Sequence, residues 1–63
     1  MTPEELEAGN LAAAELMDAA TKVADAAWHL VDARLDHSAC TADRLAQQLR
    51  VLADRLAHGL ADQ

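Results

Sequence analysis

The segment Asp36-His37-Ser38-Ala39-Cys40-Thr41 (DHSACT) decides whether this chain folds as a helical hairpin or as one long helix. It lies between two long segments rich in Ala, Leu, Asp and Arg, a composition typical of helices. Ser38 and Thr41 favour helix ends because their hydroxyl groups compete for backbone hydrogen bonds. We therefore predict a single all-α domain over residues 1–63. Its expected parts are a helix at 3–36, a turn at 37–41, a helix at 42–58 and a frayed tail at 59–63.

The alternative fold is one continuous coiled-coil helix, because the DHSACT segment contains neither Gly nor Pro. Apolar and small residues do continue through the segment at alternating spacings of three and four. Against this alternative, Ser38 and Ala42 would be weak residues in the middle of a seam that needs burial. The two-helix antiparallel hairpin is therefore the predicted fold.

Both outer ends of the chain carry helix-boundary signals. Thr2, Pro3 and Glu5 match an N-cap, a first helical position and a capping box, in that order. Gly59 matches the glycine that often follows the last turn of a helix. These signals predict a helix start at residue 3 and a helix end at residue 58.

The first predicted helix has a single narrow polar surface, which we call the acidic stripe. Its members step along the chain by three or four residues and so share one helix face. Most of the remaining surface is apolar, and alanine recurs every seven residues in two rows, at 12, 19, 26 and 33 and at 13, 20 and 27. The acidic stripe consists of Glu15, Asp18, Lys22, Asp25, His29, Asp32 and Asp36.

The second predicted helix is amphipathic and shorter, so it covers only one side of the first. Its apolar stripe is Ala42, Leu45, Leu49, Leu52 and Leu56, with Ala46, Ala53 and Leu60 beside it. A helix that is apolar over most of its circumference is normally buried over most of it. We therefore predict that two hairpins associate as a homodimer or higher oligomer, forming a four-helix bundle. The expected self-association residues are Leu16, Ala20, Val23, Ala27, Trp28, Leu30, Val31 and Leu35.

Composition excludes several classes of protein. The formal net charge is −6 with only five Lys and Arg residues, which argues against direct binding to nucleic acid. No apolar stretch is long enough to cross a membrane, and the first residues do not resemble a signal peptide. The lone cysteine, Cys40, fits a reducing compartment, so a cytoplasmic location is expected.

Two small groups of residues carry types used in catalysis or metal binding. His29 lies on the acidic stripe between Asp25 and Asp32, but that stripe is expected to face solvent. His37 and Cys40 stand three apart, without the third group or the glycine loop that a thiol nucleophile needs. We therefore predict no catalytic residue, no metal ligand, no cofactor and no enzymatic activity.

The sequence predicts a small acidic protein-interaction module that acts as an adaptor, regulator or assembly subunit. An alternative is an antitoxin, an anti-repressor or a phage-type inhibitor whose acidic helix face occupies a basic groove of a partner. A metal-binding helical bundle that uses His29 and its neighbouring aspartates is a further alternative. The expected partners are a second copy of the chain and a basic protein. The residues predicted to bind the basic partner are Glu15, Asp18, Asp25, His29, Asp32 and Asp36.

Overall fold

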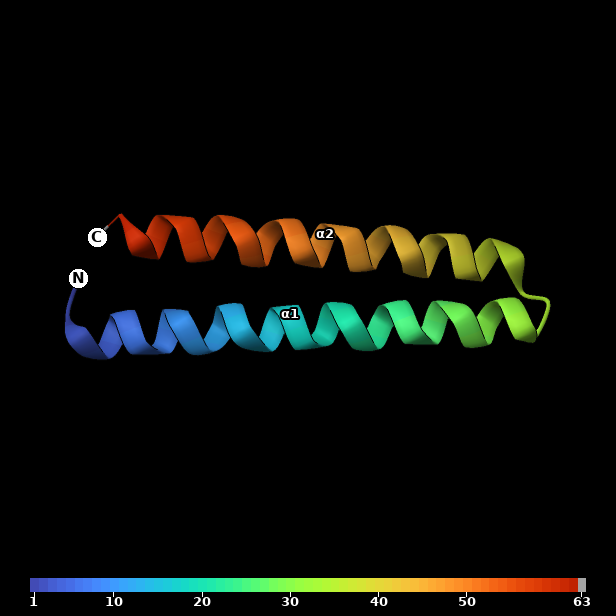
Figure 1. Ribbon diagram of the computed structural model, residues 1–63, viewed down its shortest axis with the longest axis horizontal. Coiled ribbons are helices and arrows are strands. Elements are labelled where there is room, and N and C mark those ends of the chain that lie inside the picture. The colour runs from blue at the N-terminus through green and yellow to red at the C-terminus, as the bar shows by residue number, and fades with distance from the viewer. Residues whose placement is uncertain (63) are drawn as a thin grey trace.

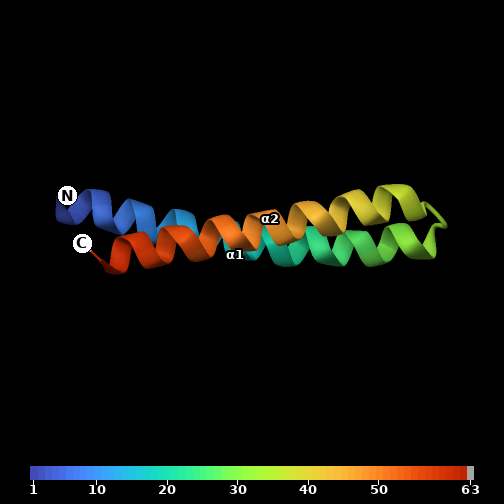
Figure 2. The same ribbon diagram turned by 90° about the horizontal axis from the view of Figure 1, so that it is seen from above.

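The protein is an antiparallel two-helix hairpin in the computed structural model, which describes residues 1–62. Helix α1 spans Pro3–Asp32 and helix α2 spans Asp36–Ala61. The helices lie side by side along their whole length, with both termini at the end opposite the turn (Figure 1). They cross at a shallow angle (Figure 2). The Cα atoms extend 47 Å along the hairpin and only 14 and 10 Å across it. The predicted hairpin is confirmed, and the alternative of one continuous helix is wrong.

The start of α1 follows the predicted capping pattern. The Thr2 hydroxyl accepts a hydrogen bond from the Glu5 backbone N–H at 3.1 Å and donates one to the Glu5 carboxylate at 3.0 Å. Pro3 occupies the first helical position, where its missing N–H leaves no helical hydrogen bond unmade. Local sequence alone therefore specified this boundary.

The turn between the helices is a Schellman motif at residues 33–35. The Leu35 N–H donates to the Leu30 carbonyl at 2.8 Å, and the Arg34 N–H donates to the Val31 carbonyl at 2.9 Å. Arg34 has a φ of 62°, the left-handed conformation that glycine usually supplies at this position. An arginine in the glycine position explains why the sequence contains no obvious turn signal there.

Three predicted positions are therefore wrong: the end of the first helix at residue 36, the turn at 37–41 and the start of the second helix at residue 42. Residues 37–41 lie inside α2, where the Thr41 hydroxyl donates to the His37 carbonyl at 3.1 Å instead of capping a helix. Asp36 begins α2, and its negative charge suits the positive end of the helix dipole. The second helix also passes through Gly59 and ends at Ala61, so most of the predicted frayed tail is helical. Gln63 lies outside the described residues.

Replacing Arg34 by glycine is expected to stabilise the hairpin by about 1 kcal/mol, because a non-glycine residue in the left-handed region is strained by roughly that amount. The melting temperature should rise by roughly 4–8 °C in a domain of this size. Thermal unfolding followed by circular dichroism measures the shift. The control is Arg34→Ala, which removes the same charge and keeps the strained φ. An equal rise in both variants would mean that charge, and not backbone strain, is the cause.

The helices pack through one row of residues on each, which we call the inner rows. Within each inner row the spacing alternates between three and four residues, as in a coiled coil. Every buried or half-buried side chain of residues 1–62 belongs to these rows, except Ala19 and Ala24. The inner row of α1 is Leu6, Gly9, Ala13, Leu16, Ala20, Val23, Ala27 and Leu30. The inner row of α2 is Ala39, Ala42, Ala46, Leu49, Ala53, Leu56 and Leu60.

Each inner row has a small side and a large side. Alanine at seven-residue intervals forms most of the small side, and the larger Leu and Val residues form most of the other. The buried residues among 1–62 are all alanines: Ala20, Ala27, Ala39, Ala46 and Ala53. Near the termini the pattern reverses, with Gly9 on the large side of the α1 row and Leu60 on the small side of the α2 row. A Cβ atom built at Gly9 would lie 2.9 Å from a Leu60 methyl carbon. Small residues thus allow the helices to approach closely, but they provide little apolar burial.

Candidate functional site

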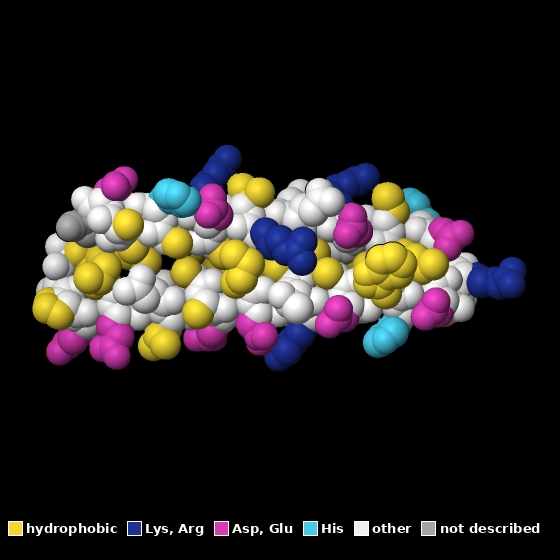
Figure 3. Space-filling model, in the orientation of Figure 1, with side chains coloured by type: hydrophobic (Ala, Val, Ile, Leu, Met, Phe, Trp, Pro, Cys, Tyr) yellow, Lys and Arg dark blue, Asp and Glu magenta, His cyan; other side chains and the backbone are white. Residues whose placement is uncertain are grey.

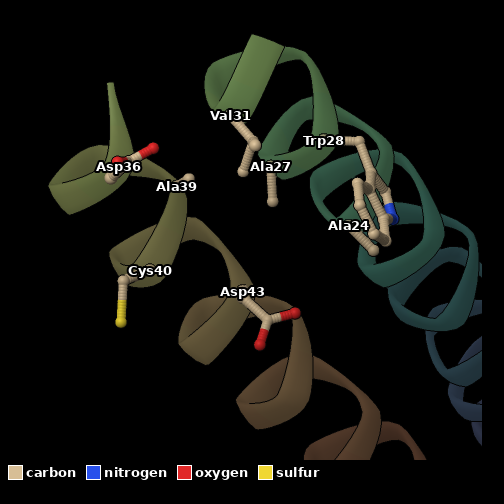
Figure 4. Close-up of a pocket in the computed structure, with 8 residues that line it drawn as sticks. All are labelled: Ala24, Ala27, Trp28, Val31, Asp36, Ala39, Cys40 and Asp43. Carbon is tan, nitrogen blue, oxygen red and sulfur yellow. The ribbon is translucent and has the colours of Figure 1, made fainter. Parts of the chain in front are cut away.

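An open groove runs between α1 and α2 near the turn, and we call it the Trp28 groove. Apolar side chains gather there between the helices, with acidic side chains beside them (Figure 3). The groove has a volume of about 470 Å³. Its lining is Ala24, Ala27, Trp28 and Val31 from α1 and Asp36, Ala39, Cys40 and Asp43 from α2 (Figure 4).

The chemistry of the Trp28 groove differs between its two walls. Trp28 is 71% exposed and, together with Val31, forms an apolar wall on α1. Asp36 and Asp43 lie on the α2 wall across the groove, and the buried alanines Ala27 and Ala39 lie between the walls (Figure 4). The short alanine side chains are the reason that a hollow exists here, because longer side chains at the same positions would fill it.

The opposite side of the hairpin carries a second apolar surface, which we call the alanine–leucine face. Ala24 and Asp43 border the groove next to the small side of each inner row. Seven-residue periodicity then places the residues next to the large side on the other face. Leu45 and Leu52 are 47% and 46% exposed there. The alanine–leucine face consists of Ala12, Ala19, Ala26 and Ala33 beside α2 residues Ser38, Leu45, Leu52 and Gly59.

The acidic stripe lies on the side of α1 that faces away from α2, as its spacing relative to the inner row requires. Its members from Glu15 to Asp32 are exposed, and Lys22 pairs with Asp18 at 3.1 Å. The prediction that Asp36 belongs to the acidic stripe is wrong. Asp36 lies in α2 and borders the Trp28 groove. With the observed boundaries, α1 carries seven acids and one base, whereas α2 carries three of each.

The residues proposed for metal or thiol chemistry do not assemble into a site. Within residues 1–62, no three His, Cys, Asp or Glu side chains lie together in a way that could hold a metal ion. His37 and Cys40 are both exposed on the first turns of α2. The described part of the chain therefore offers no geometry that supports the metal-binding alternative.

The predicted self-association residues separate into two groups. Those on the inner row of α1 pack against α2 of the same chain: Leu16, Ala20, Val23, Ala27 and Leu30. Trp28, Val31 and Leu35 are exposed, the first two at the groove and the third at the turn. Within one chain, Trp28 is therefore a surface residue, and it contributes little to the packing of the hairpin.

Besides Ala24 of α1, three α2 residues of the groove were not predicted as site residues: Ala39, Cys40 and Asp43. Their position follows from the turn, since a turn at 33–35 places them on the flank of α2 beside Trp28. The available signal was the seven-residue spacing of Asp36 and Asp43, which puts both on one side of a continuous second helix. The predicted turn at 37–41 separated these two aspartates and concealed the relationship.

Comparison of the chain with protein-family models, curated proteins and solved structures finds no match. The described helices include none with the length and hydropathy of a membrane span. The function proposed for this protein is therefore based on the two apolar surfaces and the acidic stripe.

Proposed function

We propose that this protein is a small non-enzymatic interaction module that works as a homodimeric four-helix bundle, with the alanine–leucine face as the surface shared by two copies. The observation that supports this proposal best is the weakness of the core of a single chain. Only alanines are buried among residues 1–62, while nine larger apolar side chains are exposed and the leucines and valine of the inner rows are only half-buried. A core of this kind rarely supplies more than about 3–5 kcal/mol in a chain this short.

The exposed area of the hairpin is large for its mass. It exposes 4831 Å², whereas a folded monomer of 6.7 kDa is expected to expose about 3,900 Å². The excess exposed area is about 900 Å². Each partner in a stable interface typically contributes a similar area, about 800 Å². Association of two hairpins through one long side would remove an area of this size.

The alanine–leucine face is also suited to a second copy of itself. It has small residues on α1 and leucines on α2, and none of its eight members is charged. A twofold axis along the hairpin places α2 of one chain against α1 of the other. The register of the hairpin, in which Gly9 faces Leu60, then sets Leu45 and Leu52 on either side of the partner's Ala19. Leucines on one chain thus fit between alanines on the other, as knobs fit into holes.

Light scattering over a range of protein concentrations tests the proposal. The expected result is a mass of twice 6.7 kDa that falls towards 6.7 kDa on dilution, with loss of helical circular dichroism at the lowest concentrations. A mass of 6.7 kDa at every concentration up to the millimolar range would refute self-association.

A second candidate function, inhibition of a basic partner, is supported by the acidic stripe. The stripe is exposed over the outer side of α1, and this helix carries all of the net negative charge of the two helices. Such a surface accelerates encounter with a basic surface and favours correct over incorrect partners. Neutralising Asp25 and Asp32 distinguishes this stripe from the Trp28 groove in the experiment described below.

A further inference from the structure

The Trp28 groove remains open when two copies associate through the alanine–leucine face, because the two surfaces lie on opposite sides of the hairpin. The inference below rests on the proposed function only in assigning the second copy to that other face. A tryptophan that is 71% exposed beside an alanine-floored hollow is an apolar surface without a partner in the chain. Exposed aromatic side chains next to a hollow are typical anchors of protein interfaces.

The dimensions of the groove suit an α-helix. It lies between two helices that cross at a shallow angle, so a third helix can rest in it in nearly the same direction. Its volume of about 470 Å³ accommodates the apolar side chains from one or two turns of such a helix. The alanine floor, formed by Ala27 and Ala39, lets those side chains enter between the walls.

The charges on the α2 wall specify the polar residues of the partner. Asp36 and Asp43 stand seven residues apart, which separates their Cα atoms by about 10.5 Å along the helix, or two turns. A helix lying alongside presents residues i and i+7 at the same separation. Arg50 follows on the same flank one repeat later, so the acidic part of the wall is confined to these two turns.

These charges also argue against a second copy in the groove. Twofold pairing along this side would pack Asp36 and Asp43 against the α1 wall of the second copy, whose groove residues include no cation, and burying unpaired carboxylates opposes association. A cationic helix has the opposite effect, because Lys or Arg can pair with the carboxylates. Cations can also lie against the exposed indole ring of Trp28, which attracts them.

We propose that the Trp28 groove binds an amphipathic helix of another protein that carries Lys or Arg at positions i and i+7 and apolar residues at i+3 and i+4. The apolar pair enters the hollow between Trp28, Val31 and Cys40. The two cations pair with Asp36 and Asp43.

The test uses a synthetic helical peptide with Lys at i and i+7, Leu at i+3 and i+4, and Ala and Gln elsewhere. Trp28 is the only aromatic residue of the chain, so its emission reports directly on the groove. Binding is expected to shift the emission to shorter wavelength, and anisotropy of a labelled peptide gives the dissociation constant. The control peptide carries Glu at i and i+7, and its affinity is expected to be at least tenfold weaker.

Three double variants locate the binding site on the protein. Asp36→Asn with Asp43→Asn is expected to weaken binding at least tenfold. Glu4→Gln with Asp54→Asn makes the same change in net charge away from the groove and is expected to change the affinity less than twofold. Equal weakening in these two variants would show a non-specific charge effect and overturn the proposal. Circular dichroism confirms that each variant remains helical.

The third variant, Asp25→Asn with Asp32→Asn, neutralises the acidic stripe. If it removes peptide binding while the groove variant does not, the stripe binds the cations and the groove proposal is wrong. The proposal is also overturned if the Trp28 emission shifts with protein concentration in the absence of peptide, because a second copy then covers the groove.

Light scattering on the same samples keeps the two proposals separate. A monomer that binds the peptide refutes the proposed dimer and leaves the groove proposal intact. A dimer that does not bind the lysine peptide at millimolar concentration refutes the groove proposal alone.

Discussion

The double variant Leu45→Glu with Leu52→Glu is expected to convert the proposed dimer into a monomer. Each leucine is about half exposed in the single chain, so burying the rest of its side chain contributes about 1 kcal/mol. Twofold symmetry gives four such leucines, and their loss removes about 4 kcal/mol of association free energy. This corresponds to an increase of about a thousandfold in the dissociation constant. Light scattering and the concentration dependence of the melting temperature measure the change.

The matched control is Leu11→Glu with Val51→Glu. Leu11 and Val51 are also exposed and lie on the outer sides of α1 and α2. Neither belongs to the two apolar surfaces between the helices, although Val51 and Leu52 line one shallow hollow on α2. This variant makes the same two changes from apolar to acidic and is expected to retain the dimer mass. Dissociation in both variants would indicate that added negative charge, and not loss of the alanine–leucine face, weakens association.

The variant Ala20→Asp is expected to unfold the hairpin. Ala20 is fully buried between the helices, and the short aspartate side chain cannot carry its carboxylate from there to solvent. An unpaired buried charge is destabilising by several kcal/mol, which is comparable to the whole stability of a core of this size. Circular dichroism at micromolar concentration is expected to show loss of most of the helical signal.

The control for this variant is Ala14→Asp on the same helix. Ala14 is exposed, so both variants share the cost of placing Asp in a helix, about 0.6 kcal/mol, but only Ala20→Asp buries the charge. The control is expected to remain helical, with a melting temperature a few degrees lower. If the two variants are equally stable, the inner rows do not form the packing surface of the hairpin.

Predictions from local sequence succeeded where a few neighbouring residues specify the structure. Thr2, Pro3 and Glu5 defined the beginning of α1 because their capping contacts lie within one helical turn. The prediction of the turn failed because packing between distant residues decides its position. Arg34 adopts a left-handed conformation that its side chain does not favour, and the packing of two long helices holds it there. Ser38 and Thr41 carried a stronger local signal for a turn, but the same packing keeps them inside α2.

Predictions of which helix faces are buried also succeeded only in part. The seven-residue row of Ala13, Ala20 and Ala27 was visible in the sequence, and it lies between the helices. In α2 the predicted apolar stripe was correct at Ala42, Leu49 and Leu56 and wrong at its other two members. Leu45 and Leu52 were expected inside but are half exposed, whereas Ala39, Ala46 and Ala53 are buried. The small size of alanine allows the helices to approach closely, whereas hydrophobicity alone ranks leucine above alanine as a core residue.

By itself, the sequence determined that this protein is all-α, with an acidic outer face on its first helix and more apolar surface than the single chain buries. Composition and periodicity suffice for these properties, because they depend only on the 3.6-residue repeat of a helix. Only the tertiary structure decided where the chain turns, which alanines are buried, and that Asp36 and Asp43 face Trp28 across one groove. The physical reason is that these features depend on the register between two helices. The backbone hydrogen bonds of the turn and the close approach of the helices at Gly9 and Leu60 set that register. These contacts at the terminal end join residues far apart in the sequence, so a local pattern does not reveal them.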